Sequence, residues 1–199
     1  QSSGVVCLPG THSKWVWLDG GRIESFATFM TGELFAVISE HSILKHSVAP
    51  AGAADDRAAF LAGVDAADVL GYDLLTADDR AAFLAGVDAA LEAPARIANL
   101  LFELRAASLL AGGSAEAARA RMSGLLVGLE IAGARDMLGG AAGVSLLASG
   151  PLADLYAAAL DRAGVAAHAE DAEAAARRGL HAAALRLFAL SGVTAGGQG

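Results

Sequence analysis

The feature that most constrains the fold of this chain is an abrupt change of sequence pattern near residue 31. Three short segments typical of β-strands precede it, at residues 5–8, 14–18 and 22–30. Asp19-Gly20-Gly21 is a hairpin-turn signal between the second and third segments. We therefore expect a three-stranded antiparallel meander at the start of the chain.

The sequence after residue 31 is alanine-rich and mostly helical in pattern. The expected helices start at Thr31, which we predict as an N-cap of a helix to about His46, at Pro94 and at Ser114. Two further segments, 144–148 and 165–169, look like short buried strands, and each is followed by a helix. A meander followed by strand–helix units predicts a mixed α/β layer and excludes a helical bundle.

The middle of the chain carries an exact tandem repeat. Residues 54–67 recur unchanged at 77–90, an offset of 23 residues. Thr76 and Asp79 place a capping-box signal before the second copy, whereas Ala53 stands before the first. Two copies are too few for a solenoid, so we predict two similar helices on the surface.

The same segment concentrates the negative charge of the chain. Residues 51–92 hold nine acidic and two basic residues, which contribute −7 to a formal net charge of −8. This local acidity argues against a polyanion-binding surface in the segment, but not against a nucleotide site elsewhere.

Several functional classes have little support in the sequence. No apolar run is long enough to span a bilayer, and the arginines are scattered without aromatic interleaving, so we expect neither a membrane nor a nucleic-acid partner. The histidines do not cluster, so a structural metal is not expected. The single cysteine, Cys7, lies in an apolar strand and fits a reducing, cytoplasmic environment.

The sharpest candidate site is the turn Gly10-Thr11-His12-Ser13-Lys14. It follows a strand and combines a glycine with two hydroxyl groups, an imidazole and an ammonium group. Backbone N–H groups and hydroxyls at such a turn suit a phosphoryl group, whose charge Lys14 would offset. An ordinary hairpin with polar turn residues would show the same pattern, and no Walker A loop is present.

Two further turns are weaker candidates. Thr31-Gly32-Glu33 lies where a strand passes into a helix, and Glu33 could accept hydroxyl groups of a sugar acid or simply complement the helix dipole. Ser149-Gly150 lies between a buried strand and a helix and could admit an adenosine group, although such turns are common without ligands.

Two stretches in combination resemble one known family. Pro9–Val16 reads PGTHSKWV and Met30–Leu34 reads MTGEL, and both are similar to the 2-dehydro-3-deoxygalactonokinase family. Further similar stretches are 101–106, 123–128 and 147–150. The resemblance as a whole covers nearly the whole chain except the duplicated 23 residues, which look like an extra insertion.

The resemblance implies a fold and an activity. It implies a ribonuclease-H-like domain of the actin-like and hexokinase-like ATPase fold, which transfers the γ-phosphoryl group of ATP, with Mg²⁺, to the 6-hydroxyl of 2-dehydro-3-deoxy-D-galactonate. On this basis Gly10, Thr11, His12, Ser13 and Lys14 resemble a phosphate-binding hairpin. Ser149 and Gly150 resemble an adenosine-contacting turn, and Thr31, Gly32 and Glu33 are expected near the sugar acid.

The chain departs from the family pattern in one respect. The family's first phosphate loop, an Asp-x-Gly-[Ser/Thr] motif, does not occur in these residues. We therefore expect residues 1–199 to be a carboxy-terminal kinase domain with an acidic helical insertion at about 51–92, inactive without an amino-terminal domain. Two alternatives to an enzyme remain open: a non-catalytic module that binds a sugar acid or a nucleotide, and a decayed gene fragment. The sequence also leaves open whether the gluconate epimer is the substrate and whether the protein is a homo-oligomer.

Overall fold

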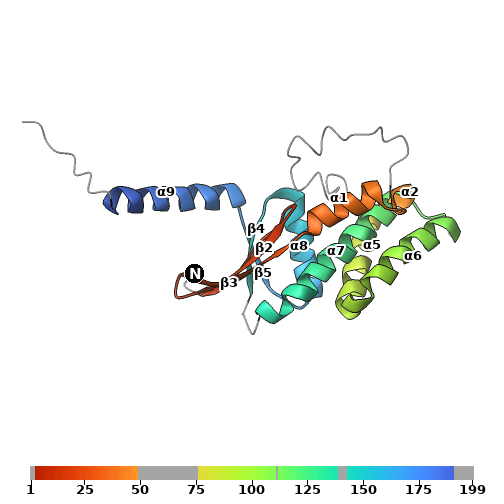
Figure 1. Ribbon diagram of the computed structural model, residues 1–199, viewed down its shortest axis with the longest axis horizontal. Helices are drawn as coiled ribbons and strands as arrows, with labels where there is room; N and C mark the ends of the chain where they lie inside the picture. Colours follow the sequence, from red (N-terminus) through yellow and green to blue (C-terminus); the bar gives the residue numbers. More distant parts are fainter. Residues whose placement is uncertain (1–2, 49–75, 111, 139–142, 191–199) are drawn as a thin grey trace, which may run out of the picture.

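The computed structural model describes residues 3–48, 76–110, 112–138 and 143–190. Figure 1 shows a sheet near the centre of these residues, a group of helices on one side and a single helix that extends away on the other. The strands are β1 (Gly4–Leu8), β2 (Ser13–Asp19), β3 (Arg22–Phe29), β4 (Val144–Leu147) and β5 (Ala167–Glu170). The helices are α1 (Thr31–His41), α2 (Lys45–Val48), α5 (Ala77–Glu92), η1 (Pro94–Arg96), α6 (Ile97–Leu110), α7 (Ala115–Leu138), α8 (Gly150–Arg162) and α9 (Ala172–Leu190).

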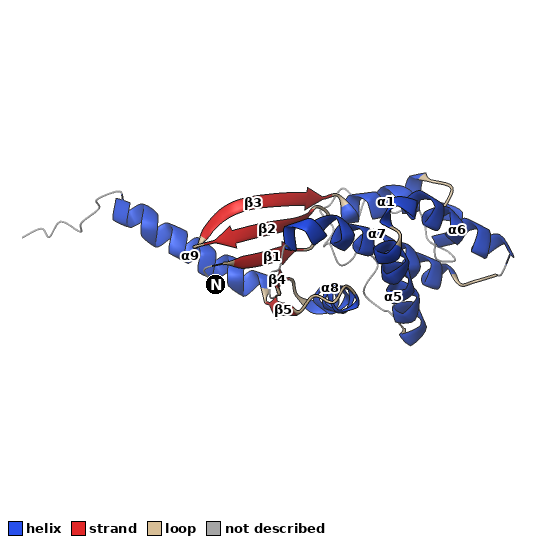
Figure 2. Ribbon diagram, turned by 90° about the horizontal axis from the view of Figure 1, so that it is seen from below, coloured by secondary structure: helices blue, strands red, loops and turns tan. Residues whose placement is uncertain are grey.

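The five strands form one mixed sheet in the order β3-β2-β1-β4-β5 (Figure 2). β1, β2 and β3 pair antiparallel, whereas β4 pairs parallel to β1 and β5 parallel to β4. The chain returns from β4 to β5 through α8, as parallel neighbours require. The predicted antiparallel meander, followed by helices and a β–α unit, is confirmed.

The β2–β3 turn depends on two glycines. Gly20 has a φ of 53° and Gly21 a φ of 76°, both in the left-handed region. This region is accessible to glycine at little cost, and two consecutive residues there match the right-handed twist of a hairpin. The turn signal that separates the two expected strands is therefore correct.

One face of the sheet packs into the core. Val5 and Cys7 of β1 and Trp15 of β2 are buried, whereas their neighbours Val6 and Val16 are half-buried. This alternation follows from the period of two in a strand. α7 and α8 supply the covering side chains, among them Tyr156, which is fully buried.

α5 and α7 form a closely packed helix pair. A Cβ atom at Gly124 of α7 would lie 1.9 Å from the carbonyl oxygen of Phe83, and one at Gly86 of α5 would lie 2.3 Å from that of Arg121. Neither distance is compatible with a side chain, so the two backbones touch directly. Glycine at these positions allows this close helix packing.

The second copy of the repeat forms α5, which is exposed on its outer face, as a surface helix should be, and buried on the other. Phe83, Val87 and Ala90 are fully buried because they face α7. The capping box is confirmed, since Asp79 N–H donates to Thr76 Oγ1 and Thr76 N–H donates to the Asp79 carboxylate. The first copy, residues 54–67, lies outside the described residues.

The helix expected from Thr31 to His46 is interrupted. Met30 is the residue before the first turn, so Thr31 begins α1 and does not cap it. The Ser42 hydroxyl donates to the carbonyl of Ile38 at 2.6 Å and accepts from the N–H of Leu44 at 3.0 Å. These local bonds compete with helix continuation, and α1 therefore ends at His41.

The other predicted helix starts hold. Ser114 Oγ accepts from the N–H of Ala117 at 3.1 Å, as an N-cap of α7 should. Pro94 begins a 3₁₀ turn, η1, that leads directly into α6.

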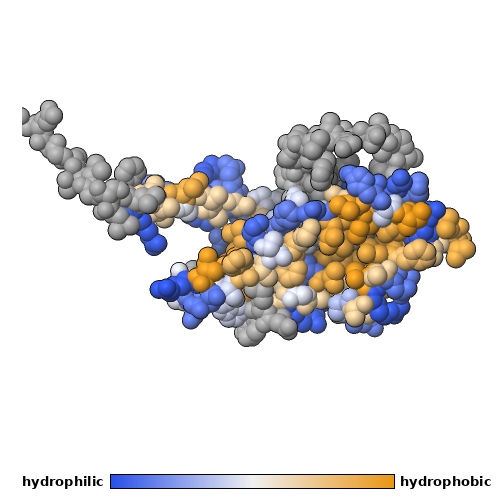
Figure 3. Space-filling view, in the orientation of Figure 1, coloured by the Kyte–Doolittle hydropathy of each residue, from blue (hydrophilic) through white to orange (hydrophobic). Residues whose placement is uncertain are grey.

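The described surface is apolar over part of the helical region (Figure 3). Exposed large apolar side chains lie on α1 and α6, including Leu34, Val37 and Phe102. α9 is exposed along residues 176–183 and carries Leu180 and Leu185 outward. Among the described residues, no helix combines the length and apolarity that crossing a bilayer requires.

The contact between α5 and α7 leads to a stability prediction. We expect Gly124→Ala to lower the free energy of unfolding by roughly 3 kcal/mol, because the methyl group would force two backbones apart. Urea titration monitored by circular dichroism measures this change. The matched control is Gly179→Ala on exposed α9, where a Cβ meets nothing within 4 Å. That substitution should leave the stability unchanged or raise it by up to about 1 kcal/mol; equal losses in both variants would contradict the prediction.

Candidate active-site edge of the sheet

The predicted site residues converge on one edge of the sheet. Cys7 pairs with Leu146 and Leu147 pairs with Glu170 in parallel registers, so β1, β4 and β5 end at the same edge. Ser13, which begins β2, pairs with Phe29, which ends β3, at this edge as well. Ligands of open α/β sheets commonly bind outside the carboxyl ends of the parallel strands.

The hairpin Gly10–Lys14 and the turn Thr31–Glu33 are in direct contact. The N–H of Glu33 donates to the carbonyl of Thr11 at 3.1 Å. A Cβ atom at Gly32 would lie 2.7 Å from the Cα of Thr11, so only glycine permits this approach. The structure therefore joins two motifs that the sequence separates by about twenty residues.

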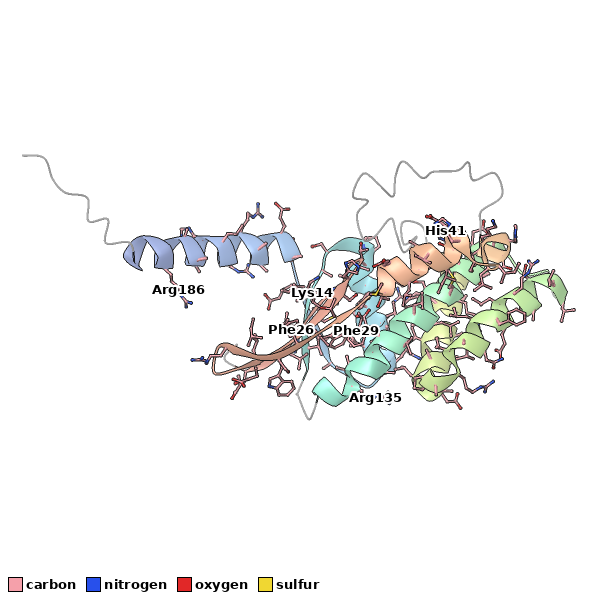
Figure 4. All side chains as sticks on the ribbon, viewed as in Figure 1. Lys14, Phe26, Phe29, His41, Arg135 and Arg186 are labelled. Atoms are coloured by element: carbon pink, nitrogen blue, oxygen red, sulfur yellow. The ribbon has the colours of Figure 1, made fainter. Side chains whose placement is uncertain are left out.

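Polar groups of these two motifs pair at the surface. His12 Nε2 lies 2.6 Å from Glu33 Oε2, with both side chains partly exposed. Lys14 Nζ donates to the carbonyl of His12 at 3.0 Å and is exposed. Figure 4 shows Lys14 at the end of the sheet that faces α1. An imidazole, an ammonium group and a carboxylate are thus presented together on the outer side of the hairpin.

Two predicted site side chains point inward instead. Ser13 and Thr31 are buried, and their hydroxyl groups take part in a polar network in the core. Ser13 Oγ lies 3.1 Å from the hydroxyl oxygen of Tyr156. The hydroxyl of Thr31 donates to the carboxylate of Glu130 in a short hydrogen bond. Any contact that these two residues make with a ligand must therefore come from the backbone.

Glu130, in the middle of α7, is the centre of this network. Its Oε1 accepts from the indole N–H of Trp15 at 2.8 Å. Its Oε2 accepts from the hydroxyl of Tyr156 at 2.9 Å as well as from Thr31. The three donors come from β2, α8 and α1, so one carboxylate connects three elements that meet at this edge.

The environment of Glu130 shifts its ionisation. Burial raises the pKa of the Glu130 carboxyl, and the hydrogen bonds from Thr31, Trp15 and Tyr156 oppose this rise only in part. Burial also raises the pKa of the Cys7 thiol well above its usual value, and the nearby charge of Glu130 adds to the effect. A buried thiol with a raised pKa is not an activated nucleophile.

Ser149 and Gly150 lie at the carboxyl end of β4. Both are exposed, and Gly150 begins α8 with a φ of 61° that favours glycine. Ser149 Oγ accepts from the N–H of Ala172 at 3.4 Å, which links this turn to the first residue of α9. The turn thus shares the edge with the hairpin.

Sequence reasoning missed three residues of the network, Trp15, Glu130 and Tyr156. Only one signal could have indicated them. Glu130 is the single charged residue between Met122 and Gly133, a stretch that is otherwise apolar or small and that is mostly buried. A lone carboxylate in such a helix requires buried hydrogen-bond donors.

The described residues contain no group of three or more side chains among His, Cys, Asp and Glu that could hold a metal ion. Glu33 is the carboxylate at the contact between the hairpin and the turn, and it is paired with His12. Mg²⁺ is usually bound through one or two carboxylates, waters and the phosphates of the substrate, so it needs no such cage. The described residues at this edge therefore do not form a metal cage of their own.

The fold and this edge define an α/β protein whose candidate ligand groups lie at the carboxyl end of a mixed sheet. The chain belongs to the 2-keto-3-deoxy-galactonokinase family, whose sequence profile matches residues 1–77 and 68–183. Each of these two segments contains one copy of the repeat. The predicted family resemblance is confirmed.

Individual relatives agree with this assignment. The Rhizobium meliloti (strain 1021) protein named Probable 2-dehydro-3-deoxygalactonokinase DgoK1 is 46% identical over 189 residues, which is 94% of this chain and 54% of the relative. The 2-dehydro-3-deoxygalactonokinase of Escherichia coli (strain K12) is 32% identical over 162 residues, 81% of this chain and 47% of the relative. A crystal structure from Sinorhizobium meliloti, described as a 2-dehydro-3-deoxygalactonokinase protein, matches with a TM-score of 0.75 and 44% identity over 94% of this chain and 55% of its own. The chain thus spans about half the length of these relatives.

The raised pKa of Glu130 predicts a pH dependence of stability. A carboxyl with a raised pKa binds its proton more tightly in the folded state, so folding is favoured at low pH. This contribution is lost as the pH rises from the ordinary glutamate range through the raised pKa. Glu130→Gln, which cannot ionise, should lack it.

Urea titrations of both proteins between pH 4 and pH 8 measure this effect. The free energy of unfolding of the unsubstituted protein minus that of Glu130→Gln should fall as the pH rises. A difference that stays constant, or that grows with pH, would show that burial does not govern this carboxyl.

Proposed function

We propose that this chain is the carboxy-terminal domain of an ATP-dependent sugar-acid kinase that phosphorylates the 6-hydroxyl of 2-dehydro-3-deoxy-D-galactonate. The observation that carries the proposal is the contact between the hairpin Gly10–Lys14 and the turn Thr31–Glu33. A kinase must hold a phosphoryl donor and an acceptor hydroxyl side by side, and it gains most of its rate from that placement. Membership of the family and the names of its relatives support the same activity.

A ribonuclease-H-like domain of the actin-like and hexokinase-like ATPase fold is the architecture we propose. The mixed sheet supports it, because an antiparallel meander is extended on one side by parallel strands and a helical crossover. The loops that such a domain would turn toward its ligands all lie at one edge here.

Each motif has a proposed role. Backbone groups of Gly10 and Thr11, with the side chains of His12 and Lys14, would contact the phosphates, because they form the exposed donor groups of the hairpin. Ser13 would act through its backbone and anchor the hairpin through its buried hydroxyl. The exposed turn Ser149-Gly150 would contact adenosine.

The turn Thr31–Glu33 would face the sugar acid. Glu33 provides the accessible side chain, while Thr31 and Gly32 are buried and fix its position. In the absence of substrate Glu33 is paired with His12, so a sugar hydroxyl would replace that partner.

ATP would supply the phosphoryl group, and Mg²⁺ would offset the charge of its phosphates. The donor set of the hairpin fits a polyphosphate, since it offers an ammonium group and an imidazole, and the neighbouring carboxylate of Glu33 is already paired with that imidazole. The residue that accepts the hydroxyl proton is not assigned among the described residues.

We propose that an amino-terminal domain, equivalent to the remaining part of the relatives, completes the site. The chain covers 54% and 47% of the two curated relatives, and the Asp-x-Gly-[Ser/Thr] loop expected on the other side of the cleft is absent from its sequence.

The substrate is a small-molecule sugar acid, and a cytoplasmic location stays a prediction. One copy of the 23-residue repeat is an insertion in this proposal, and the other, α5, belongs to the core.

The test is ADP release by the protein encoded by the complete reading frame. Mg-ATP is supplied with 2-dehydro-3-deoxygalactonate and, in parallel, with its gluconate epimer. We expect turnover with preference for the galactonate compound, and none from residues 1–199 alone. A folded full-length protein that binds these ligands without turnover would instead indicate a binding module.

Lys14→Met tests the phosphate role of the hairpin. Loss of a charged hydrogen bond to phosphate should lower kcat/KM for ATP by about 10- to 100-fold. Lys45→Met is the matched control, because Lys45 is the other lysine of the chain and is exposed on α2. Similar activities in the two variants would exclude Lys14 from the phosphate site.

A further inference from the structure

We propose that Glu130 is a positioning residue that sets the placement of the hairpin Gly10–Lys14, the turn Thr31–Glu33 and helix α8 relative to one another. The inference rests on the proposed function, because it assigns to Glu130 the alignment of the phosphoryl donor with the acceptor. Glu130 is buried and does not itself touch a ligand. It acts through the residues that carry the three ligand loops.

The connections of Glu130 are specific to those loops. Trp15 follows directly after Lys14 of the hairpin, and Thr31 directly precedes Gly32 of the turn. Tyr156 lies on the helix that begins at Gly150. Each of the three hydrogen-bond donors therefore belongs to the element that presents one predicted ligand loop, and no two of them come from the same element.

The two carboxylate oxygens divide these connections unequally. Oε1 accepts from Trp15, whereas Oε2 accepts from both Thr31 and Tyr156. The hydroxyl oxygen of Tyr156 in turn lies 3.1 Å from Ser13 Oγ. The hairpin is therefore connected to Glu130 twice, directly through Trp15 and indirectly through Ser13 and Tyr156. A displacement of α8 changes the geometry around Oε2 and reaches the hairpin through Tyr156 and Ser13, whereas a displacement of α1 acts first on the turn Thr31–Glu33 with which α1 begins.

The network is costly for an arrangement that serves stability alone. A buried carboxylate loses its hydration, and an apolar side chain of similar volume often stabilises a core equally well or better. The direction of the Glu130 pKa shift agrees that burial is only partly compensated. Hydrogen bonds have directions and apolar contacts do not, so the carboxylate provides a defined placement that packing alone would not provide.

The helix that carries Glu130 is suited to this role. α7 packs against α5 with direct backbone contact at Gly124, and Gly128 of α7 also lies against Val87 of α5. Ile131, which follows Glu130 in α7, is fully buried. A positioning group is most effective on an element that cannot itself move.

Steady-state kinetics of the full-length kinase with Glu130→Leu and Glu130→Gln test the proposal. Leucine removes all three hydrogen bonds at similar volume, and we expect kcat to fall by about 100-fold because misplacement by about 1 Å costs that much. Glutamine retains an oxygen for Trp15, and its amide can donate to the hydroxyl oxygens of Thr31 and Tyr156. It should therefore recover most of the lost kcat although it carries no charge.

Two near-isosteric variants cover the case in which Glu130→Leu fails to fold. Thr31→Val and Tyr156→Phe each remove one hydroxyl from Glu130. We expect Thr31→Val to raise KM for the sugar acid about 10-fold with little change in KM for ATP, and Tyr156→Phe to do the reverse. A residue that only stabilises the fold would not separate the two KM values in this way.

Ile131→Val is the matched control on the same helix. It should lower the melting temperature without changing either KM. The inference is overturned if folded Glu130→Leu keeps kcat within about threefold, or if all the variants lose activity only in proportion to their loss of stability. Inactivity of the unsubstituted full-length protein would instead overturn the proposed function, and the inference with it.

Discussion

The hydrogen bonds to the buried carboxylate of Glu130 are the interaction on which the rest of this structure depends. A carboxylate in the core is tolerated only where donors replace its water, and the donors here are Trp15, Thr31 and Tyr156. Each donor arrives on a different element, so satisfying one charged group brings together β2, α1 and α8. The convergence of the candidate ligand loops at one sheet edge follows from this requirement together with the parallel pairing of β1, β4 and β5.

A second constraint acts on the opposite side of α7. The glycine positions at Gly86 and Gly124 let α5 approach until backbone meets backbone. This contact holds α7 in place, and α7 in turn holds Glu130 beneath the sheet. The two kinds of interaction therefore support each other. The packing against α5 fixes helix α7, and the hydrogen bonds to Glu130 fix the loops relative to that helix.

Much of the architecture was predictable because its signals are local. The β-type segments, the glycine turn at Gly20-Gly21 and the capping box at Thr76 each depend on neighbouring residues, and all three were correct. The role of Thr31 was not predictable in the same way. Its side chain matches an N-cap locally, but a carboxylate 99 residues away in the sequence competes for its hydroxyl and determines the outcome.

The same distinction explains the candidate site. The hairpin and the turn could be recognised as motifs, but their direct contact depends on Gly32 meeting Thr11 across the edge of the sheet. The second copy of the repeat was predicted as a surface helix, and its outer face is exposed. Its apolar residues Phe83 and Val87 nevertheless lie on the face toward α7, and that face determines its burial.

The glycine contact between α5 and α7 has an evolutionary consequence. A position that admits no Cβ atom cannot drift to any other residue unless the facing helix changes as well, so substitutions on the two helices must occur together or not at all. The duplicated segment retains a glycine, Gly63, at the position that corresponds to Gly86. In the structure it is Gly86 that meets α7, so the requirement for glycine falls on the second copy of the repeat.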